Sequence, residues 1–242
     1  MENAEKRFYE LAERAEERFY NTFSDFLNME EQSTLASMKL KAPFCLYGGY
    51  NDAERCIAVF GDGCESAETP VKAIRIEPLS KKFSEKLTHR DYLGTLMGLG
   101  IRREMLGDIV VDENGAVLFC LEAVAEFITA ELIRIRRTSV KCSVIDNTQD
   151  IVKSEALERE IIAASERLDV IISAVYNFSR SAVKEVFLQR RVFVNSRICE
   201  NFSYIPKEND IISVRRCGRF VYGGVLGETK KGRKIIKIMQ YR

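Results

Sequence analysis

Hydrophobic positions near the amino terminus recur every three or four residues, which is the spacing of an amphipathic helix. A second helical run from Met29 to Lys41 is closed by Pro43. Short apolar runs at 44–47 and 56–60, flanked by glycine-containing turns, predict two strands. Residues 1–70 are therefore expected to form a small mixed α/β module. The hydrophobic positions of its first helix are Phe8, Leu11, Ala12, Ala15, Phe19 and Phe23.

The pattern over residues 71–150 alternates between the strand period and the helix period. A strand is predicted over 71–78, and a helix begins at Thr88, where Asp91 completes a capping box. A hairpin around residues 113–115, a second helix over AVAEFITAELIRI and a last strand over SVKCSVI follow. Strand, helix, strand, strand, helix, strand is the order of a split βαβ, or ferredoxin-like, plait, which is RRM-shaped. The buried stripe of its first helix is expected to comprise Leu93, Leu96 and Met97.

A polar stretch separates this region from the last third of the chain, and residues 151–164 are predicted to be a linker. Over 165–242 the pattern predicts an amphipathic helix around 167–176, a second helix starting near Ser179, and strands that end in a β-hairpin. We therefore expect an α+β protein in which a small helix–turn–helix and antiparallel sheet follow the plait.

The net charge of +1 conceals two regions of opposite charge. Residues 151–242 hold 18 Lys and Arg against 10 Asp and Glu, whereas the first 150 residues hold 19 against 26. A basic third joined to an acidic remainder is typical of a chain whose carboxy-terminal part meets a polyanion. Chance segregation of charge is the alternative.

Several functional classes are disfavoured by composition. No run of apolar residues approaches the roughly 18 that are needed to span a bilayer, so no membrane insertion is expected. With one histidine and no CxxC pair, a zinc site of the usual spacing cannot be built. The seven cysteines are expected to be reduced thiols of a cytoplasmic protein.

The segment SRSAVKEVFLQRRVFVN at 179–195 concentrates positive charge around one short helix. Ser179 or Ser181 can cap it. If the helix persists to Arg191, then Arg180, Lys184 and Arg191 lie within about 40° of one another, opposite the apolar stripe. A solvated helix face is one interpretation, and a docking surface for RNA phosphates is the other. Surface helices usually pair a cation with an acid four residues later, but no acid stands four residues after Arg180. This uncompensated charge favours the phosphate-docking interpretation.

The same segment carries a family resemblance. RLD at 167–169, SRS at 179–181, RVFVN at 191–195 and the later NDIISVR resemble the S4 RNA-binding domain. Arg190 and Ser196 stand where that domain usually has glycine. The residues that we predict to bind RNA are Arg167, Ser179, Arg180, Ser181, Lys184, Arg190, Arg191, Asn195, Arg197, Arg215, Arg216 and Arg219.

Motifs in the middle of the chain make the family resemblance more specific. LTHRDYLGTLMGLGIRREMLGDIVV, followed later by VRRCGRF, is similar to the YlmH-type S4 proteins of Gram-positive bacteria. This resemblance implies a non-catalytic adaptor that binds the large ribosomal subunit in ribosome-associated quality control. It implies rRNA and tRNA as partners, a link to cell-division proteins, and no cofactor. We expect a monomer.

His89 and Arg90 invite a catalytic interpretation, but no serine or cysteine partner accompanies them in a recognisable motif. We predict a structural or RNA-contacting role for both residues and no catalytic residue in the chain. GLGIRRE lacks the third glycine of a dinucleotide loop. The strand AVLFCLE offers one aromatic residue where RNA-recognition motifs stack bases on two or three, so base stacking on the sheet is not expected.

Two rival functions remain. One is an RNA-modifying enzyme of the pseudouridine-synthase type, because such enzymes often carry an S4 domain and an RLD-containing motif. Here RLD continues as VIISA inside the predicted helix. The other rival is a septum-associated scaffold whose RNA binding is incidental.

Overall fold

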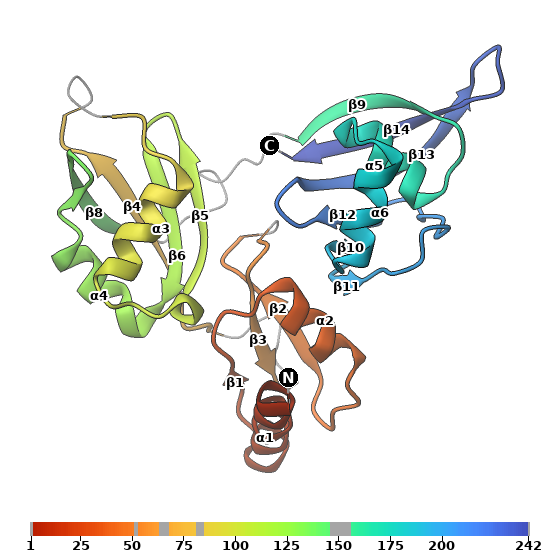
Figure 1. The fold of residues 1–242 in the computed structure, drawn as a ribbon. Helices are drawn as coiled ribbons and strands as arrows, with labels where there is room; N and C mark the ends of the chain where they lie inside the picture. Colours follow the sequence, from red (N-terminus) through yellow and green to blue (C-terminus); the bar gives the residue numbers. More distant parts are fainter. Residues whose placement is uncertain (1, 51–52, 63–67, 81–84, 146–155, 242) are drawn as a thin grey trace. The chain divides into compact units, whose positions relative to one another are not determined.

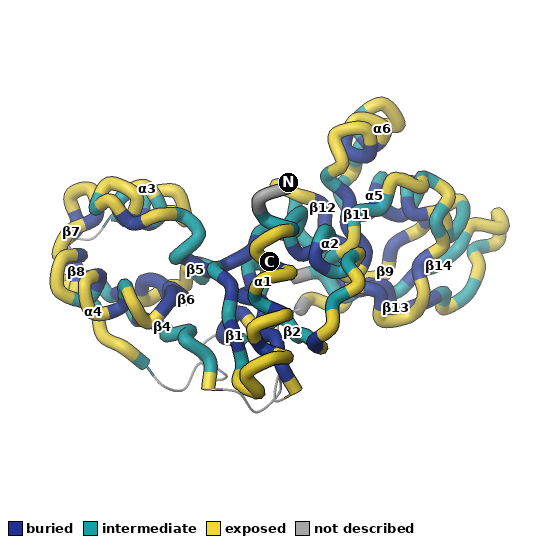
Figure 2. Tube along the Cα trace, turned by 90° about the horizontal axis from the view of Figure 1, so that it is seen from below, coloured by how far each residue is buried: buried dark blue, intermediate teal, exposed yellow. Residues whose placement is uncertain are grey.

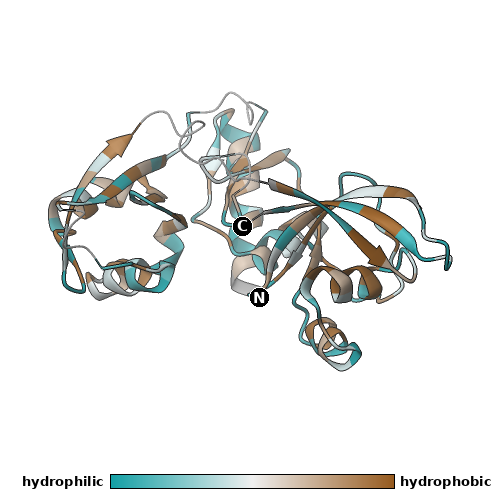
Figure 3. Cartoon of the chain, turned by 90° about the horizontal axis from the view of Figure 1, so that it is seen from above, coloured by the Kyte–Doolittle hydropathy of each residue, from teal (hydrophilic) through white to brown (hydrophobic). Residues whose placement is uncertain are grey.

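The computed structural model describes residues 2–50, 53–62, 68–80, 85–145 and 156–241 (Figure 1). The chain has a mixed α/β fold and divides into two compact units, each with its own hydrophobic core. The first comprises Met1–Glu31 and Ser37–Lys153, and the second comprises Gln32–Ala36 and Ser154–Arg242. Figure 3 shows hydrophobic stretches along the strands and hydrophilic stretches in the connecting loops.

The amino-terminal module contains the predicted strands, but its helices are shorter than predicted. The helices are α1 (Glu2–Arg18) and α2 (Met29–Ser37), and β1 (Thr22–Phe23), β2 (Phe44–Tyr47) and β3 (Ile57–Phe60) form a sheet in the order β1-β3-β2. Phe19 adopts a left-handed φ of 53° and is 93% exposed. Phe23 pairs with Val59 in the sheet. The helical extension to Phe23 was therefore wrong, because strand pairing overrides a local helical period.

The next segment follows the predicted order of elements. The helices α3 (His89–Gly98) and α4 (Glu122–Glu131) accompany a sheet in the order β5-β6-β4-β8-β7. Its strands are β4 (Val71–Pro78), β5 (Leu106–Asp112), β6 (Gly115–Leu121), β7 (Arg134–Ile135) and β8 (Thr138–Ile145), with a 3₁₀ turn at Arg103–Met105 before β5. Thr88 and Asp91 form the predicted capping box, in which the Thr88 amide donates to Asp91 Oδ2 at 2.8 Å. The buried stripe of α3 was partly mispredicted, because Tyr92 and Leu96 are buried whereas Met97 is 44% exposed.

Each face of this sheet carries a packed core. On one face, Ile74, Ile76 and Leu118 pack in a core with Leu96 of α3 and Ile128 of α4. On the other face, Ala73, Val117 and Phe119 pack in a core with Phe26, Ile57 and Val59 of the amino-terminal module. The alternation of side chains along each strand assigns successive residues to these two cores.

A hydrogen-bonded loop secures the amino-terminal module to β5. The Asp108 carboxylate accepts hydrogen bonds from the Tyr50 hydroxyl at 2.9 Å and from the amides of Glu54 and Arg55 at 2.6 and 3.1 Å. The Arg55 guanidinium donates to the carbonyls of Leu106 at 3.0 Å and Phe26 at 2.9 Å. Burial lowers the pKa of Arg55, and the nearby Asp108 carboxylate opposes that effect.

The second unit packs two short helices on a six-stranded antiparallel sheet. Its helices are α5 (Leu168–Tyr176) and α6 (Arg180–Leu188). Its strand order is β11-β10-β12-β13-β14-β9, comprising β9 (Ala156–Ala163), β10 (Val192–Val194), β11 (Arg197–Ile198), β12 (Ile211–Val214), β13 (Gly218–Glu228) and β14 (Lys234–Tyr241). Ile171, Ile172, Val183 and Phe187 of the helices pack against Phe220 and other sheet residues. Figure 2 shows the outer surface of α6 as exposed.

The predicted linker at 151–164 was wrong over the part that the structure describes. Ala156–Ala163 form β9, which pairs along its whole length with β14. Glu158 lies opposite Met239 in the ladder, and its carboxylate contacts the Lys237 ammonium at 2.8 Å. Residues 151–155 lie outside the described residues. A charged strand at a sheet edge resembles a polar linker in sequence, because charge is a common way to protect an edge.

Candidate nucleic-acid interface

Helix α6 begins as the sequence predicts. The Ser179 hydroxyl accepts a hydrogen bond from the Ala182 amide at 3.2 Å and lies 2.9 Å from the Ser181 hydroxyl. Val183, Val186 and Phe187 bury one face of the helix, whereas Arg180 and Lys184 are exposed. Within the described part of the chain, neither Arg180 nor Lys184 makes a side-chain hydrogen bond or an ion pair. Both charges are therefore available to a ligand.

The helix does not persist to Arg191, so the predicted three-cation stripe was wrong. It ends at Leu188, and Arg190 follows with a left-handed φ of 53°. The guanidinium of Arg191 instead donates from Nε to the Arg215 carbonyl at 3.1 Å, and Nη2 donates to the same oxygen. Arg191 thus connects the end of α6 to the turn after β12, and Arg180 and Lys184 are the pair that shares a helix face.

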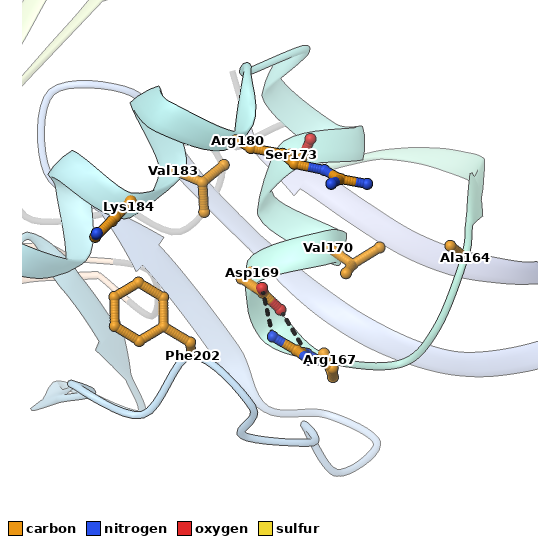
Figure 4. Close-up of a pocket in the computed structure, with 9 residues that line it drawn as sticks. All are labelled: Ala164, Arg167, Asp169, Val170, Ser173, Arg180, Val183, Lys184 and Phe202. Carbon is orange, nitrogen blue, oxygen red and sulfur yellow. Dashed lines mark hydrogen bonds and ion pairs between the residues drawn. The ribbon is translucent and has the colours of Figure 1, made fainter.

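These two cations line a groove of about 770 Å³ between α5 and α6 (Figure 4). Arg167, which precedes α5, lies on the same groove and forms a two-bond pair with Asp169, at 2.8 Å from Nη2 and 3.1 Å from Nε. Hydrogen bonding to Asp169 raises the pKa of Arg167. Because that pair is internally neutral, the positive charge of the groove comes from α6. The groove is lined by Ala164, Arg167, Asp169, Val170, Ser173, Arg180, Val183, Lys184 and Phe202.

Phe202 supplies an apolar wall that sequence analysis missed. Its ring stacks on Phe187 with centroids 4.6 Å apart, and one side of it faces the groove (Figure 4). The ring comes from the loop between β11 and β12, 26 residues after the last residue of α5, Tyr176. Only the tertiary fold brings it to the groove that Arg180 and Lys184 line, so no local sequence signal could have identified it.

The turn between β10 and β11 uses its polar side chains internally. Asn195 and Ser196 have φ of 49° and 63°, as a tight hairpin turn requires. The Asn195 amide nitrogen donates to Asp210 Oδ1 at 2.7 Å, and its oxygen accepts from the Ile211 amide at 2.9 Å. Asn195 therefore stabilises the loop, and a contact between this side chain and RNA stays a prediction.

The other predicted arginines lie around strands β10 to β13. Arg190 pairs with Glu200 at 3.3 Å. Arg197 is exposed on β11, Arg215 and Arg216 are exposed in the turn after β12, and Arg219 is half-buried on β13. The structure thus brings Arg167, Arg180 and Lys184 together at one groove, whereas these arginines do not line it. Sequence analysis also left out the exposed cations Lys230, Lys231 and Arg233 in the β13–β14 loop, although the letters KKGR mark them.

Comparisons with known proteins match the middle of the chain in one case and most of its length in another. Residues 67–149 match a family model described as "Putative RNA-binding domain in YlmH". The chain is 30% identical over 222 residues to the ribosome-associated protein quality control protein P2 of Bacillus subtilis (strain 168), covering 89% of this chain and 86% of that protein. This chain belongs to the YlmH family.

A solved structure with a YlmH name is also similar. The cell division protein ylmH from Streptococcus pneumoniae aligns with a TM-score of 0.48 at 20% identity, over 60% of this chain and 90% of that one. Among the described residues of this YlmH-family chain, no helix is long and apolar enough to cross a membrane. The same residues contain no group of three or more side chains suited to hold a metal ion.

His89 and Arg90 lie within the residues that match the YlmH model, on the first turn of α3. Both side chains are exposed. Neighbouring atoms displace water from the imidazole and the Arg103 guanidinium lies nearby, so the pKa of His89 is below its ordinary value of 6.5. The imidazole is therefore neutral near pH 7, and Arg90 supplies the positive charge of this turn.

Proposed function

We propose that this chain is a non-catalytic adaptor that binds structured RNA on the large ribosomal subunit in ribosome-associated quality control. The observation that carries the proposal is the groove between α5 and α6, where Arg180 and Lys184 make no side-chain bond within the described residues. The name of the Bacillus subtilis relative and the description of the matching family model support it. Its RNA partners are rRNA and tRNA, and a link to cell division belongs to the same proposal.

The domain assignment is part of the proposal. The strand order β5-β6-β4-β8 with α3 and α4 supports a ferredoxin-like plait over 71–150, after a module over 1–70. The α5–α6 pair followed by an antiparallel sheet supports an S4 domain over 165–242. Strand β9 completes the sheet of this last domain, so the domain includes residues 156–163.

The chemistry of the groove fits a nucleic-acid backbone. Arg180 and Lys184 are separated by one helical turn, so both charges lie on one face of α6 and can neutralise phosphates. The groove between α5 and α6 can admit the RNA strand that carries these phosphates. The Phe202 ring offers an apolar face against which a ribose or base can lie. The Arg167–Asp169 pair forms another part of the wall, and the Arg167 side chain is 49% exposed, so its other guanidinium donors are accessible.

We expect the combined replacement Arg180→Ala and Lys184→Ala to weaken RNA binding and to flatten its salt dependence by about two units of slope, because two phosphate contacts are lost. The measurement is filter binding of bulk tRNA across salt concentrations, together with co-sedimentation with purified large ribosomal subunits. Co-sedimentation also separates the adaptor from a septum-associated scaffold, and analysis of modified nucleosides tests the RNA-modifying enzyme.

Lys234→Ala with Lys237→Ala is the matched control. Both lysines lie on β14 of the same unit and pair with acids, Lys234 with Glu228 at 2.7 Å and Lys237 with Glu158 at 2.8 Å. The control changes the net charge equally and should leave the slope within error. An unchanged slope in the Arg180 and Lys184 variant would remove the groove from the interface.

A further inference from the structure

The matched segment of the plait cannot bind RNA by stacking bases on the outer face of its sheet. Phe119 of β6 is 0% exposed, and its ring stacks on Tyr50 with centroids 4.9 Å apart. The Gly49 backbone approaches so closely that a Cβ on that residue would lie 2.3 Å from the Phe119 ring. The opposite face packs against α3 and α4. Neither the middle of the outer face nor the helix-covered face therefore offers a surface for stacking bases, which leaves the exposed edges of the sheet as candidate RNA contacts.

One rim concentrates positive charge. The β7–β8 hairpin turns at Arg136 and Arg137, because Ile135 pairs directly with Thr138. Helix α3 contacts β7, so the hairpin lies beside the helix (Figure 2). Arg136 also reaches Asp91 in the first turn of α3, at 3.3 Å between Nη1 and Oδ1. We define the hairpin patch as the exposed residues Lys86, Arg90, Arg134, Arg136 and Arg137.

The acids at this rim are already engaged. Asp91 caps α3 through Thr88 and pairs with Arg136, and Glu85 accepts from the Arg137 amide at 3.2 Å and contacts Arg136 at 3.9 Å. Glu131, at the end of α4, is a further exposed acid nearby in the chain. The patch therefore holds more positive than negative charge.

Arg134 and Arg137 are the best-placed cations of the patch. Arg134 uses Nε to donate to the Arg136 carbonyl at 3.0 Å, which orients its guanidinium and leaves four other N–H donors. The Arg137 side chain makes no hydrogen bond or ion pair within the described part of the chain. Surface arginines with this freedom suit phosphate oxygens, because the guanidinium fork can bind two of them at once.

We infer that the hairpin patch is a second RNA-backbone contact, separate from the groove of the carboxy-terminal domain. The inference rests on the proposed function, because it assigns a surface of the plait to the same class of ligand. The ligand is the phosphate backbone of a folded RNA, and the patch reads no bases. Arg134 and Arg137 bind phosphates, and Arg136 holds the turn against α3.

The test uses the full chain and the bulk tRNA filter-binding assay. Arg134→Ala with Arg137→Ala should lower the salt slope by about two units and the affinity by about tenfold or more near 0.1 M salt. Lys6→Ala with Lys41→Ala is the matched control, because these exposed lysines of the same unit pair with Glu10 at 3.9 Å and Glu13 at 3.5 Å. Arg134→Lys with Arg137→Lys should retain the slope, and circular dichroism checks that each variant is folded.

The outcomes separate this inference from the proposed function. If the hairpin variant keeps the parental slope and affinity while the Arg180 and Lys184 variant loses them, the hairpin patch is overturned and the proposed function stands. If only the hairpin variant loses slope, the patch stands and the groove is overturned. If all variants match the parent, both are overturned. Combined replacement of all four residues should add the two slope changes, because the sites lie in different units.

Discussion

Phe119→Ala should destabilise the first unit by about 3–5 kcal/mol, the largest stability effect that we expect from a single core substitution in this chain. Phe119 is fully buried on β6 and stacks on Tyr50. It belongs to the core that the sheet shares with Phe26 and Val59. The substitution removes a large ring from between the sheet and the amino-terminal module, and the rigid strands around it can close the cavity only in part.

Urea unfolding followed by circular dichroism measures the loss, and hydrogen exchange of the β6 amides assigns it to the first unit. Phe127→Ala is the matched control, because Phe127 lies on α4 and is 47% exposed. That control should change the free energy of unfolding by no more than about 0.5 kcal/mol. Similar losses in the two variants would mean that the sheet face is not sealed by Phe119.

Local sequence patterns sufficed for elements that are defined by their own neighbours. The strands at 44–47 and 71–78 have the predicted bounds, and the capping box of α3 forms between Thr88 and Asp91. In each case the signal and the structure lie within a few residues. Elements that depend on a distant partner were missed. Strand β9 is ordered by β14, about eighty residues later, and its own residues are strongly charged.

The candidate site also contains residues that local spacing predicts and residues whose place depends on distant parts of the chain. Ser179 as the cap, and Arg180 and Lys184 on the exposed face of α6, follow from helical spacing alone. Arg191 could not be placed by that spacing, because the left-handed residue at Arg190 ends the helical geometry. The sequence identified Asn195 as a possible donor to RNA. It gave no indication that the Asn195 amide nitrogen already donates to the Asp210 carboxylate. Phe202 reaches the groove only through the fold of the loop that carries it.

Asp210→Ala should destabilise the second unit by about 2–4 kcal/mol, because a buried carboxylate there satisfies three donors. They are the Asn195 amide at 2.7 Å, the Tyr204 hydroxyl at 2.9 Å and the Lys207 backbone amide at 2.9 Å. Asp210→Asn is the matched control, since it keeps the size of the side chain and one acceptor. It should cost less than the alanine variant.

The pH dependence of the same site has a defined sign. Burial acts to raise the pKa of Asp210, but the hydrogen bonds from the Lys207 amide, Asn195 and Tyr204 hold it below the ordinary value of 3.8. A folded-state pKa below the unfolded one gives a stabilisation that is fully present above pH 3.8 and is lost as the pH falls through the folded-state value. The difference in unfolding free energy between the parent and Asp210→Asn should therefore be constant near neutral pH and shrink below about pH 4. A difference that stays the same in acid would show that the ionised carboxylate is not what these three donors stabilise.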